Sequence, residues 1–458
     1  MKTSKQILIF AFSLMLVLSG SFAAAKVSQQ EADRLKTDLM PTGGERAGNA
    51  EGTIPAWDGG GVPIPAGWNG KPGDFLPDPF KDDKVLFSIN AANMDQYADK
   101  LSEGTKWLLK RHPDTFRLDV YPTRRTMKAP QYVYDYTYKN ALNASMDEAR
   151  QGIQNAYGGI PFPIPKHAEE IVYNHILRWQ GASRYSTSRG YNVSGSGTVT
   201  LTNASFSAEN YPLYYPGEPN YEADLWHFYG PVTGPARRKG ELLLVVDAVN
   251  PLKQPRKAWQ YLPGQRRVRR APTLSYDNPN PGSAITTYDD AFQFNGALDR
   301  FDWKIIGKKE MYMPYNCYKQ NLVEKIEDFA LAGHFNPDLV RWELHRMWVV
   351  EATVKEGKRH VYGRRIFFFD EDSWFLQLKD QYDNRDNFWR FNIGMNYFDY
   401  SSTPNLVTMN WMNWDVTVPF WNPLATYIGV EHLPITREKE INPKEWFTPA
   451  YLRKAGRR

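Results

Sequence analysis

The stretch that decides the fold is RWELHRMWVVEATVK at residues 341–355, followed by EGKRHVYGRRIFFFD at 356–370 and EDSWFLQL at 371–378. Apolar side chains occupy all but one of the alternate positions from 342 to 354, and they share one face: Trp342, Leu344, Trp348, Val350, Ala352 and Val354. The opposite face carries the polar residues Arg341, Glu343, His345, Glu351, Thr353 and Lys355, as expected of a half-buried strand. Short turns at 356–357 and 370–373 connect this strand to returns at 359–369 and from 374 onward, which predicts an antiparallel meander.

Patterns typical of strands and helices also occur in the chain before this meander. Period-two patterns at 198–206 and 302–312, and an apolar run at 241–248, predict further strands. Helical spacing predicts helices over 90–110 and 166–180, whereas the Gly- and Pro-rich stretch 40–79 predicts irregular chain. The fold class is therefore mainly β with helices (α+β), with one large antiparallel sheet carrying a helical and irregular N-terminal part.

Composition narrows the possible classes of protein. The chain has 458 residues, of which 42% are hydrophobic, 23% charged and an unusual 14% aromatic, and aromatic residues favour strands. A single cysteine excludes an internal disulfide and a thiolate zinc site. The formal net charge of +5, about +3 without Lys2 and Lys5, is too small for a general nucleic-acid binder, so no nucleic-acid partner is expected.

The first 25 residues have the pattern of a secretory signal peptide. Lys2 and Lys5 precede an apolar run at 7–18, and small residues follow up to Ala25. We expect cleavage after Ala25, a mature single domain over 26–458 and, because no cysteine follows the apolar run, no lipid anchor.

The most basic stretch is RRVRR at 266–270. On a strand, alternation places Arg266 and Arg270 on one face and Arg267 and Arg269 on the other, so at least one pair must meet water, carboxylates or an anion. Two interpretations stay open: a solvated or salt-bridged edge, and a contact with a lipid headgroup, a membrane surface or an acidic partner.

The aromatic residues of the meander are the candidates for a ligand site. Such residues on successive strands usually form a sheet core, but a strongly curved sheet can leave its concave aromatic face partly open as an apolar cavity. On the second interpretation the cavity candidates are Trp342, Trp348, Phe367, Phe369 and Trp374.

No catalytic motif is found. The chain lacks a Gly-x-Ser-x-Gly elbow, a His-Glu-x-x-His pair, a phosphate-binding loop and a dinucleotide fingerprint. His167, Glu169, Glu170 and His175 do not have zinc-ligand spacing, and the acids at 370–372 are expected to be solvated in a turn. We therefore expect no enzyme, no cofactor and no metal.

Several longer strings resemble one family of uncharacterised Gram-negative exported proteins. They are LMPTGGERAGNAEGTIPAW at 39–57, YPTRR at 121–125, WQYLPGQRRVRRAP at 259–272, residues 295–315, and NPDLVRWELHR at 336–346. This family is similar to the outer-membrane lipoprotein-sorting carriers LolA and LolB. The resemblance implies an unclosed β-barrel whose concave apolar face is capped by helices and holds acyl chains or a similar ligand. It also implies a periplasmic location and, as partners, an outer-membrane barrel protein and an RND-type exporter.

The leading hypothesis is a periplasmic, non-enzymatic carrier that binds a lipid or another hydrophobic molecule, with lipoprotein acyl chains among the cargoes that the resemblance suggests. Arg266, Arg267, Arg269 and Arg270 would then meet a headgroup, a membrane surface or a protein partner. Two alternatives stay open. One is a periplasmic adaptor with a filled core between exporter and barrel, and the other is a glycan-active enzyme, which requires paired carboxylates about 5 to 10 Å apart in a cleft.

Overall fold

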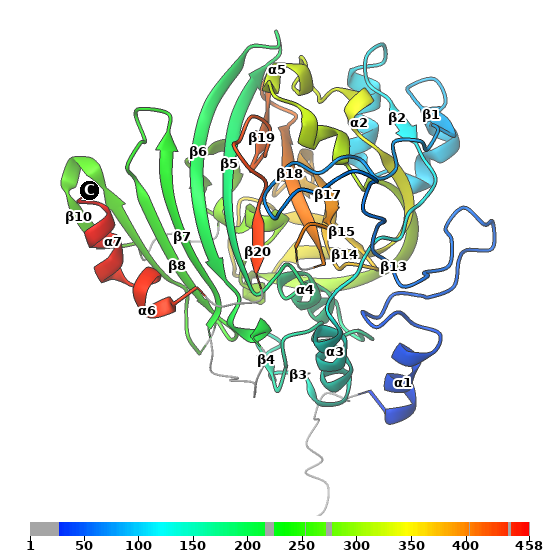
Figure 1. The fold of residues 1–458 in the computed structure, drawn as a ribbon, viewed down its shortest axis with the longest axis horizontal. Helices are drawn as coiled ribbons and strands as arrows, with labels where there is room; N and C mark the ends of the chain where they lie inside the picture. The colour runs from blue at the N-terminus through cyan, green and yellow to red at the C-terminus, as the bar shows by residue number, and fades with distance from the viewer. Residues whose placement is uncertain are drawn as a thin grey trace, which may run out of the picture.

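A computed structural model describes residues 27–215, 224–251, 253–271, 277–402, 404–437 and 441–457. Sixteen strands of these residues form one sheet, in the order β1-β2-β14-β15-β16-β17-β18-β19-β5-β6-β7-β8-β9-β10, with β13 paired to β14 and β20 to β5. The sheet is strongly curved, with β5 to β8 and β10 on one side and β13, β14, β15 and β17 on the other (Figure 1). The expected signal peptide lies outside the described residues.

The strands of the main sheet have the following bounds: β1 Phe87–Ile89, β2 Leu118–Val120, β5 Ser183–Ser194, β6 Val199–Asn210, β7 Asp224–Gly234, β8 Leu242–Ala248, β9 Lys257–Leu262, β10 Arg267–Arg270, β13 Phe301–Pro314, β14 Trp342–Val354, β15 Arg364–Asp370, β16 Leu376–Tyr382, β17 Phe388–Asp399, β18 Asn405–Asp415, β19 Phe420–Leu424 and β20 Ile435–Arg437. Two short hairpins stand apart: β3 Ser145–Met146 with β4 Ile153–Gln154, and β11 Pro279–Asn280 with β12 Ser283–Thr287.

The α-helices have the following bounds: α1 Gln29–Asp33, α2 Glu103–Arg111, α3 Gln131–Asn143, α4 Ala168–Ile176, α5 Ile326–Phe329, α6 Pro443–Trp446 and α7 Pro449–Ala455. Helix α2 packs on β16 and β17, and its first N–H groups, those of Glu103 and Gly104, donate to the buried Asp380 carboxylate. Helix α7 packs on β8, β9 and β10.

Neighbouring strands pair antiparallel, except for a single parallel contact between β2 and β14. Strand β14 pairs with β13 over 13 registered residues, from Phe301 opposite Val354 to Pro314 opposite Trp342. Among the described strands, the two ends of the sheet, β10 and β13, do not pair with each other. The predicted fold class, a large antiparallel sheet that stays unclosed, is confirmed.

Several predicted elements differ in extent from those observed. The helix expected over 90–110 is interrupted at Leu101, whose extended backbone separates the 3-10 helix Met94–Lys100 from α2, with Ser102 capping α2. The helix expected over 166–180 ends at Ile176. Helix α3 lacks a clear apolar period and was not predicted from the sequence.

The turn at 370–373 was expected to be solvated, and this expectation is wrong. Asp370, Glu371 and Asp372 are at most 1% exposed, because the irregular N-terminal chain lies over them. Arg125 donates to Asp372 at 2.9 Å and to the main-chain oxygen of Glu45 at 2.6 Å, while Arg346 joins Glu371 to the same segment. The Gly/Pro-rich chain is thus fixed by buried ion pairs. In the described part of the chain, no helix has the length and apolarity needed to cross a membrane.

Candidate functional site

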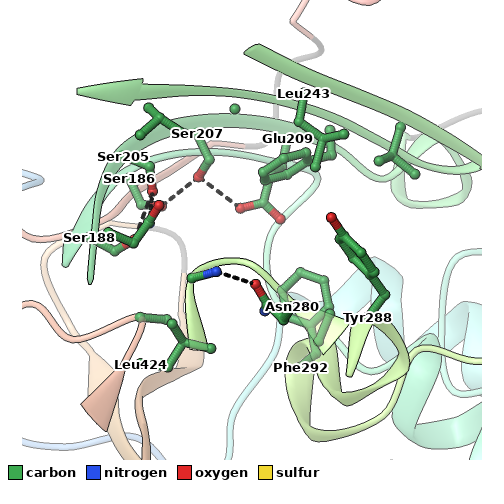
Figure 2. A pocket seen from close by; sticks show the side chains of 18 of the residues that line it. Ser186, Ser188, Ser205, Ser207, Glu209, Leu243, Asn280, Tyr288, Phe292 and Leu424 are labelled. Atoms are coloured by element: carbon green, nitrogen blue, oxygen red, sulfur yellow. Dashed lines mark hydrogen bonds between the residues drawn. The ribbon is translucent and has the colours of Figure 1, made fainter. Parts of the chain in front are cut away.

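A cavity of about 260 Å³ lies between β5–β9 and the chain that runs from β11 to Asn295 (Figure 2). We call residues 279–295 the inner segment and the sheet surface that faces it the inner face. The inner face contributes Arg184, Ser186, Ser188, Ser205, Ser207, Glu209, Trp226, Phe228, Gly230, Val232, Leu243, Val245 and Gln260. Across from it lie Asn280, Tyr288, Ala291, Phe292 and Asn295 of the inner segment, together with Arg178, Trp411 and Leu424.

One wall of the cavity is a ladder of serines on β5 and β6. Ser186 and Ser207 are registered opposite each other with their hydroxyls 2.8 Å apart, and Ser188 and Ser205 form the next rung at 3.4 Å (Figure 2). Because a serine occupies far less volume than a leucine or an aromatic residue, this part of the inner face does not fill the interior of the sheet. The ladder leaves space and presents hydroxyls to it.

Apolar side chains form much of the rest of the cavity surface. Phe228 and Val245 are registered partners on β7 and β8, as are Gly230 and Leu243, and all four line the cavity. From the inner segment, the Phe292 ring meets Trp226 edge-on at 5.2 Å and Trp411 at 5.4 Å. The cavity therefore has one hydroxyl-bearing wall and a larger apolar surface, as binding sites for amphiphilic small molecules commonly do.

Three of the arginines at the cavity have carboxylate partners. Arg184 pairs with Glu209 at 2.8 Å, Arg238 with Glu241 at 3.0 Å, and Arg256 with Asp247 at 2.6 Å. Glu209 is only 2% exposed and also accepts from Tyr211 and Trp226. Both carboxylates that line the cavity, Glu209 and Glu241, are thus engaged in ion pairs.

Arg178, the fourth arginine, differs from these three. Its side chain follows α4, is 2% exposed and lines the cavity. It donates to the main-chain oxygen of His175 at 2.7 Å and to Gln180 at 3.3 Å, whereas its Nε has no hydrogen-bond partner and no carboxylate of the described residues lies within ion-pair distance. Burial, and to a smaller extent the charge of Arg184, lowers the pKa of Arg178 to about 10.

The inner segment is held by buried charges on the other half of the sheet. Asp290 accepts from Lys379 and from Gln381, and Arg365 donates to Asp289 at 2.9 Å. Phe292 adopts a left-handed backbone conformation with φ of 53°, and its main-chain oxygen lies 3.0 Å from His175 Nε2. The ion pairs on β15 and β16 thus position Phe292 at the cavity wall.

None of the five predicted aromatic candidates is among the residues that line this cavity. Trp342, Phe367, Phe369 and Trp374 are fully buried, and Trp348 is half-buried beneath the Lys308 ammonium. Phe367 contacts Phe294 and Trp303, and Phe369 contacts His175, so these two rings pack against the inner segment and α4. A role of the five in ligand contact stays a prediction.

The four arginines of the basic stretch lie at an edge of the sheet. Arg266 occupies the turn before β10, and Arg267, Arg269 and Arg270 are exposed on that edge strand. Arg269 is registered opposite Gln260, which lines the cavity, while Val268 packs on the opposite face beneath α7. In the described part of the chain none of the four forms an ion pair, and their contact with a headgroup or partner stays a prediction.

The residues that form the cavity were not singled out from the sequence. The alternation at 198–206 predicts a strand, and the small side chains on one face of that strand also indicate unfilled space beside it. The small size of these residues is the sequence signal that could have located the serine wall. Arg178 gives no local signal, because its lack of a carboxylate partner depends on residues far away in the chain. Among the described residues, no three His, Cys, Asp or Glu side chains are placed to hold a metal ion.

Comparison with known proteins places this chain in a family. Residues 88–453 match the family described as "Protein of unknown function (DUF1329)". An uncharacterized protein of Pseudomonas aeruginosa is 43% identical over 395 residues, which cover 85% of this chain and 86% of that protein. The chain is also similar to the crystal structure of a DUF1329 family protein from Desulfovibrio piger, at 15% identity over 60% of this chain and 92% of that chain, with a TM-score of 0.41. It is similar as well to the crystal structure of a putative outer membrane lipoprotein-sorting protein domain from Vibrio parahaemolyticus, at 13% identity over 62% of this chain and 97% of that chain, with a TM-score of 0.42. The family prediction is confirmed, and the chain belongs to the DUF1329 family.

Proposed function

We propose that this protein is a carrier that binds a lipid or another hydrophobic molecule in the cavity between β5–β9 and the inner segment. The observation that carries the proposal is the cavity itself: an interior space bounded by Trp226, Phe228, Val245 and Phe292 on apolar walls and by serines on one wall. Each methylene group that moves from water into such a space contributes about 0.8 kcal/mol. A short acyl chain is therefore enough for useful affinity without any catalytic group.

The cavity and the ion pairs of its carboxylates support the carrier over the two alternatives. A periplasmic adaptor with a filled core needs no cavity, and a glycan-active enzyme needs free paired carboxylates, whereas Glu209 and Glu241 are each paired with an arginine. Contact with an outer-membrane barrel protein and an RND-type exporter, which the family resemblance implies, stays a prediction. So does a periplasmic location, which rests on the signal-peptide pattern of the first 25 residues.

The first experiment is mass spectrometry of an organic extract of the protein, purified from its own periplasm without detergent. We expect a lipid or other hydrophobic compound in stoichiometric amount. Protein that is free of such a compound, and that also fails to bind the probe described next, would overturn the carrier proposal.

The second experiment places the ligand in the cavity. The neutral fluorophore N-phenyl-1-naphthylamine is titrated into the wild-type protein and into Leu243→Trp, a substitution that adds volume inside the cavity on β8. We expect a loss of affinity of about tenfold or more, because the added ring occupies the space of the probe. The matched control is Thr200→Trp, which adds the same side chain at an exposed position of β6 and should bind like the wild type.

The aromatic candidates are tested in the same titration. Trp348 is the half-buried one of the five, so Trp348→Glu is the substitution that the fold tolerates best. Reduced probe affinity in a folded Trp348→Glu variant would extend the binding surface to β14. Unchanged affinity in the folded variant would remove Trp348 from the binding surface.

A further inference from the structure

We propose that Arg178 binds the head group of the ligand and that the ligand is an amphiphile with one anionic head, a carboxylate or a phosphate. This inference rests on the proposed function, since it assigns the polar end of the molecule whose apolar chain occupies the cavity. Three features support this assignment: the hydrogen bonds of Arg178, the charge balance of the cavity and the rings in contact with Arg178.

The guanidinium of Arg178 has hydrogen-bond donors without a partner. It carries five N–H donors, and only Nη1 and Nη2 make hydrogen bonds, to His175 and Gln180, while the buried Nε has none. A buried donor without a partner costs about 1–3 kcal/mol, so an arginine kept in this state suggests a partner that arrives with the ligand. A carboxylate or phosphate accepts two N–H groups of one guanidinium at once.

The charge balance of the cavity favours an anion. Arg184, Arg238 and Arg256 each have a carboxylate partner, and Glu209, an acid whose charge acts on Arg178, is already bound by Arg184. The cavity therefore carries one uncompensated positive charge, that of Arg178. A ligand with one negative charge neutralises it, whereas a cationic ligand would meet repulsion in a poorly solvated space.

Neighbouring rings hold the guanidinium in place. Its central carbon lies 4.4 Å from the centre of the Phe375 ring and 5.6 Å from that of Phe292. Phe292 and Trp226 line both the main cavity and a smaller adjoining hollow, and Arg178 borders both spaces. Arg178 thus lies where the two spaces adjoin, and the apolar residues of β7 and β8 in the main cavity provide a surface for the chain of the ligand.

The experiment compares amphiphiles that differ only in the head group. Bound N-phenyl-1-naphthylamine is displaced by dodecanoate, dodecyl phosphate and 1-dodecanol at pH 8, each below the concentration at which it forms micelles. We expect at least one anion to bind about 10- to 100-fold more tightly than the alcohol, the range expected for hydrogen bonds to a charged group. The tighter of the two anions identifies the head-group chemistry.

Variants then assign this preference to Arg178. In Arg178→Met the ratio of alcohol to anion dissociation constants should fall to about one, while the affinity for the neutral probe stays unchanged. Arg178→Lys keeps the positive charge and should retain part of the preference. Arg385→Met removes a charge at an exposed turn and should retain all of it.

The outcomes separate this inference from the proposed function. Wild-type protein that does not bind the neutral probe would contradict the carrier itself. Probe binding without preference for an anion, or a preference that survives in Arg178→Met, would overturn only the assignment of Arg178. The head-group comparison on the wild type needs no variant, so it holds even where Arg178→Met fails to fold.

Discussion

At the scale of single residues, burial decides how titratable side chains behave in this protein. His112 and His334 lie with their ring centres 4.9 Å apart, beside Phe116 and the end of α2. Burial, together with the charge of the neighbouring histidine, lowers the pKa of His112 to about 4, and burial also lowers the pKa of His334. Both histidines are therefore neutral in the folded protein at neutral pH.

This pair predicts sensitivity to acid. Because the folded pKa of His112 lies below the ordinary value of 6.5, the folded state binds fewer protons than the unfolded state, so stability falls as the pH drops from 6.5 towards 4. We expect His112→Phe, which keeps a ring in place, to reduce this loss. The melting temperature of the variant should fall less between pH 7.5 and pH 5 than that of the wild type, by about 1–2 °C.

The control for this prediction is His432→Phe, which changes a half-buried histidine outside the pair and leaves the contact between His112 and His334 intact. It should keep the wild-type dependence on pH. Equal pH dependence in His112→Phe and in the wild type would show that the pair does not cause the acid sensitivity.

At the scale of elements, the inner segment is the part that turns a curved sheet into a binding site. It forms the wall opposite β5–β8, but its anchors are on β15 and β16, where Arg365 and Lys379 hold Asp289 and Asp290. Burial lowers the pKa of Lys379, and the Lys379 charge in turn helps to hold the pKa of Asp290 low. One half of the sheet therefore shapes the cavity on the other half.

Removing only one member of the buried Lys379–Asp290 ion pair should strongly reduce the stability of the fold. Lys379→Met leaves the buried Asp290 charge without its cation, so we expect a loss of about 3–5 kcal/mol in the free energy of unfolding, measured with urea. Affinity for N-phenyl-1-naphthylamine should also fall, because the inner segment loses its anchor. Adding Asp290→Asn removes the stranded charge and should restore at least about half of the lost stability.

The matched control is the exposed pair Lys106–Glu103 on α2, with its charged atoms 3.1 Å apart. Lys106→Met should cost at most about 1 kcal/mol, because solvent screens this pair. A loss in Lys379→Met no greater than in Lys106→Met would contradict the anchoring role.

At the scale of the whole molecule, the open sheet places its basic edge beside the cavity. Strand β10 pairs with β9, and the exposed Arg269 is registered opposite Gln260 of the cavity lining. The far edge of the sheet, on β13, carries the exposed Lys304 and Lys309. A closed barrel would have neither edge, so the unclosed fold leaves both available for contacts.

The basic edge predicts binding to anionic membranes. Each basic side chain near such a surface contributes about 1 kcal/mol, so Arg267→Ser combined with Arg269→Ser should weaken binding to vesicles that contain phosphatidylglycerol by about 10- to 30-fold. The wild-type affinity should also fall as salt is raised. Vesicle sedimentation measures both effects.

The control removes the same charge from the other edge, as Lys304→Ser with Lys309→Ser. These lysines lie away from the cavity-lining strands β5–β9, and the double variant should bind vesicles like the wild type. An equal loss in both double variants would show that the attraction comes from the overall charge of the protein.

Sequence analysis recovered a large share of the fold, because strand formation here depends on local patterns. The alternation at 341–355 and the turn at 356–357 correspond to β14 and the start of the return to β15, and the patterns at 198–206, 241–248 and 302–312 correspond to β6, β8 and β13. Less was recovered of the helices. Leu101 breaks the helix expected over 90–110, and α3 was missed because its apolar residues do not follow a clear helical period.

The sequence by itself determined the strands of the sheet and indicated the family, since alternation, turn residues and the strings that resemble the family lie within short stretches of chain. Only the tertiary structure decided where the interior is filled and where it is empty. Phe367 and Phe369 contact the inner segment and α4, so side chains fill the interior on their half of the sheet. On the other half, the small serine side chains of β5 and β6 do not fill the interior, and the cavity remains. That Arg178 has no carboxylate beside it also depends on distant partners, because Glu209 is bound by Arg184. Volume and charge balance are sums over residues far apart in the chain, and the fold alone brings these residues together.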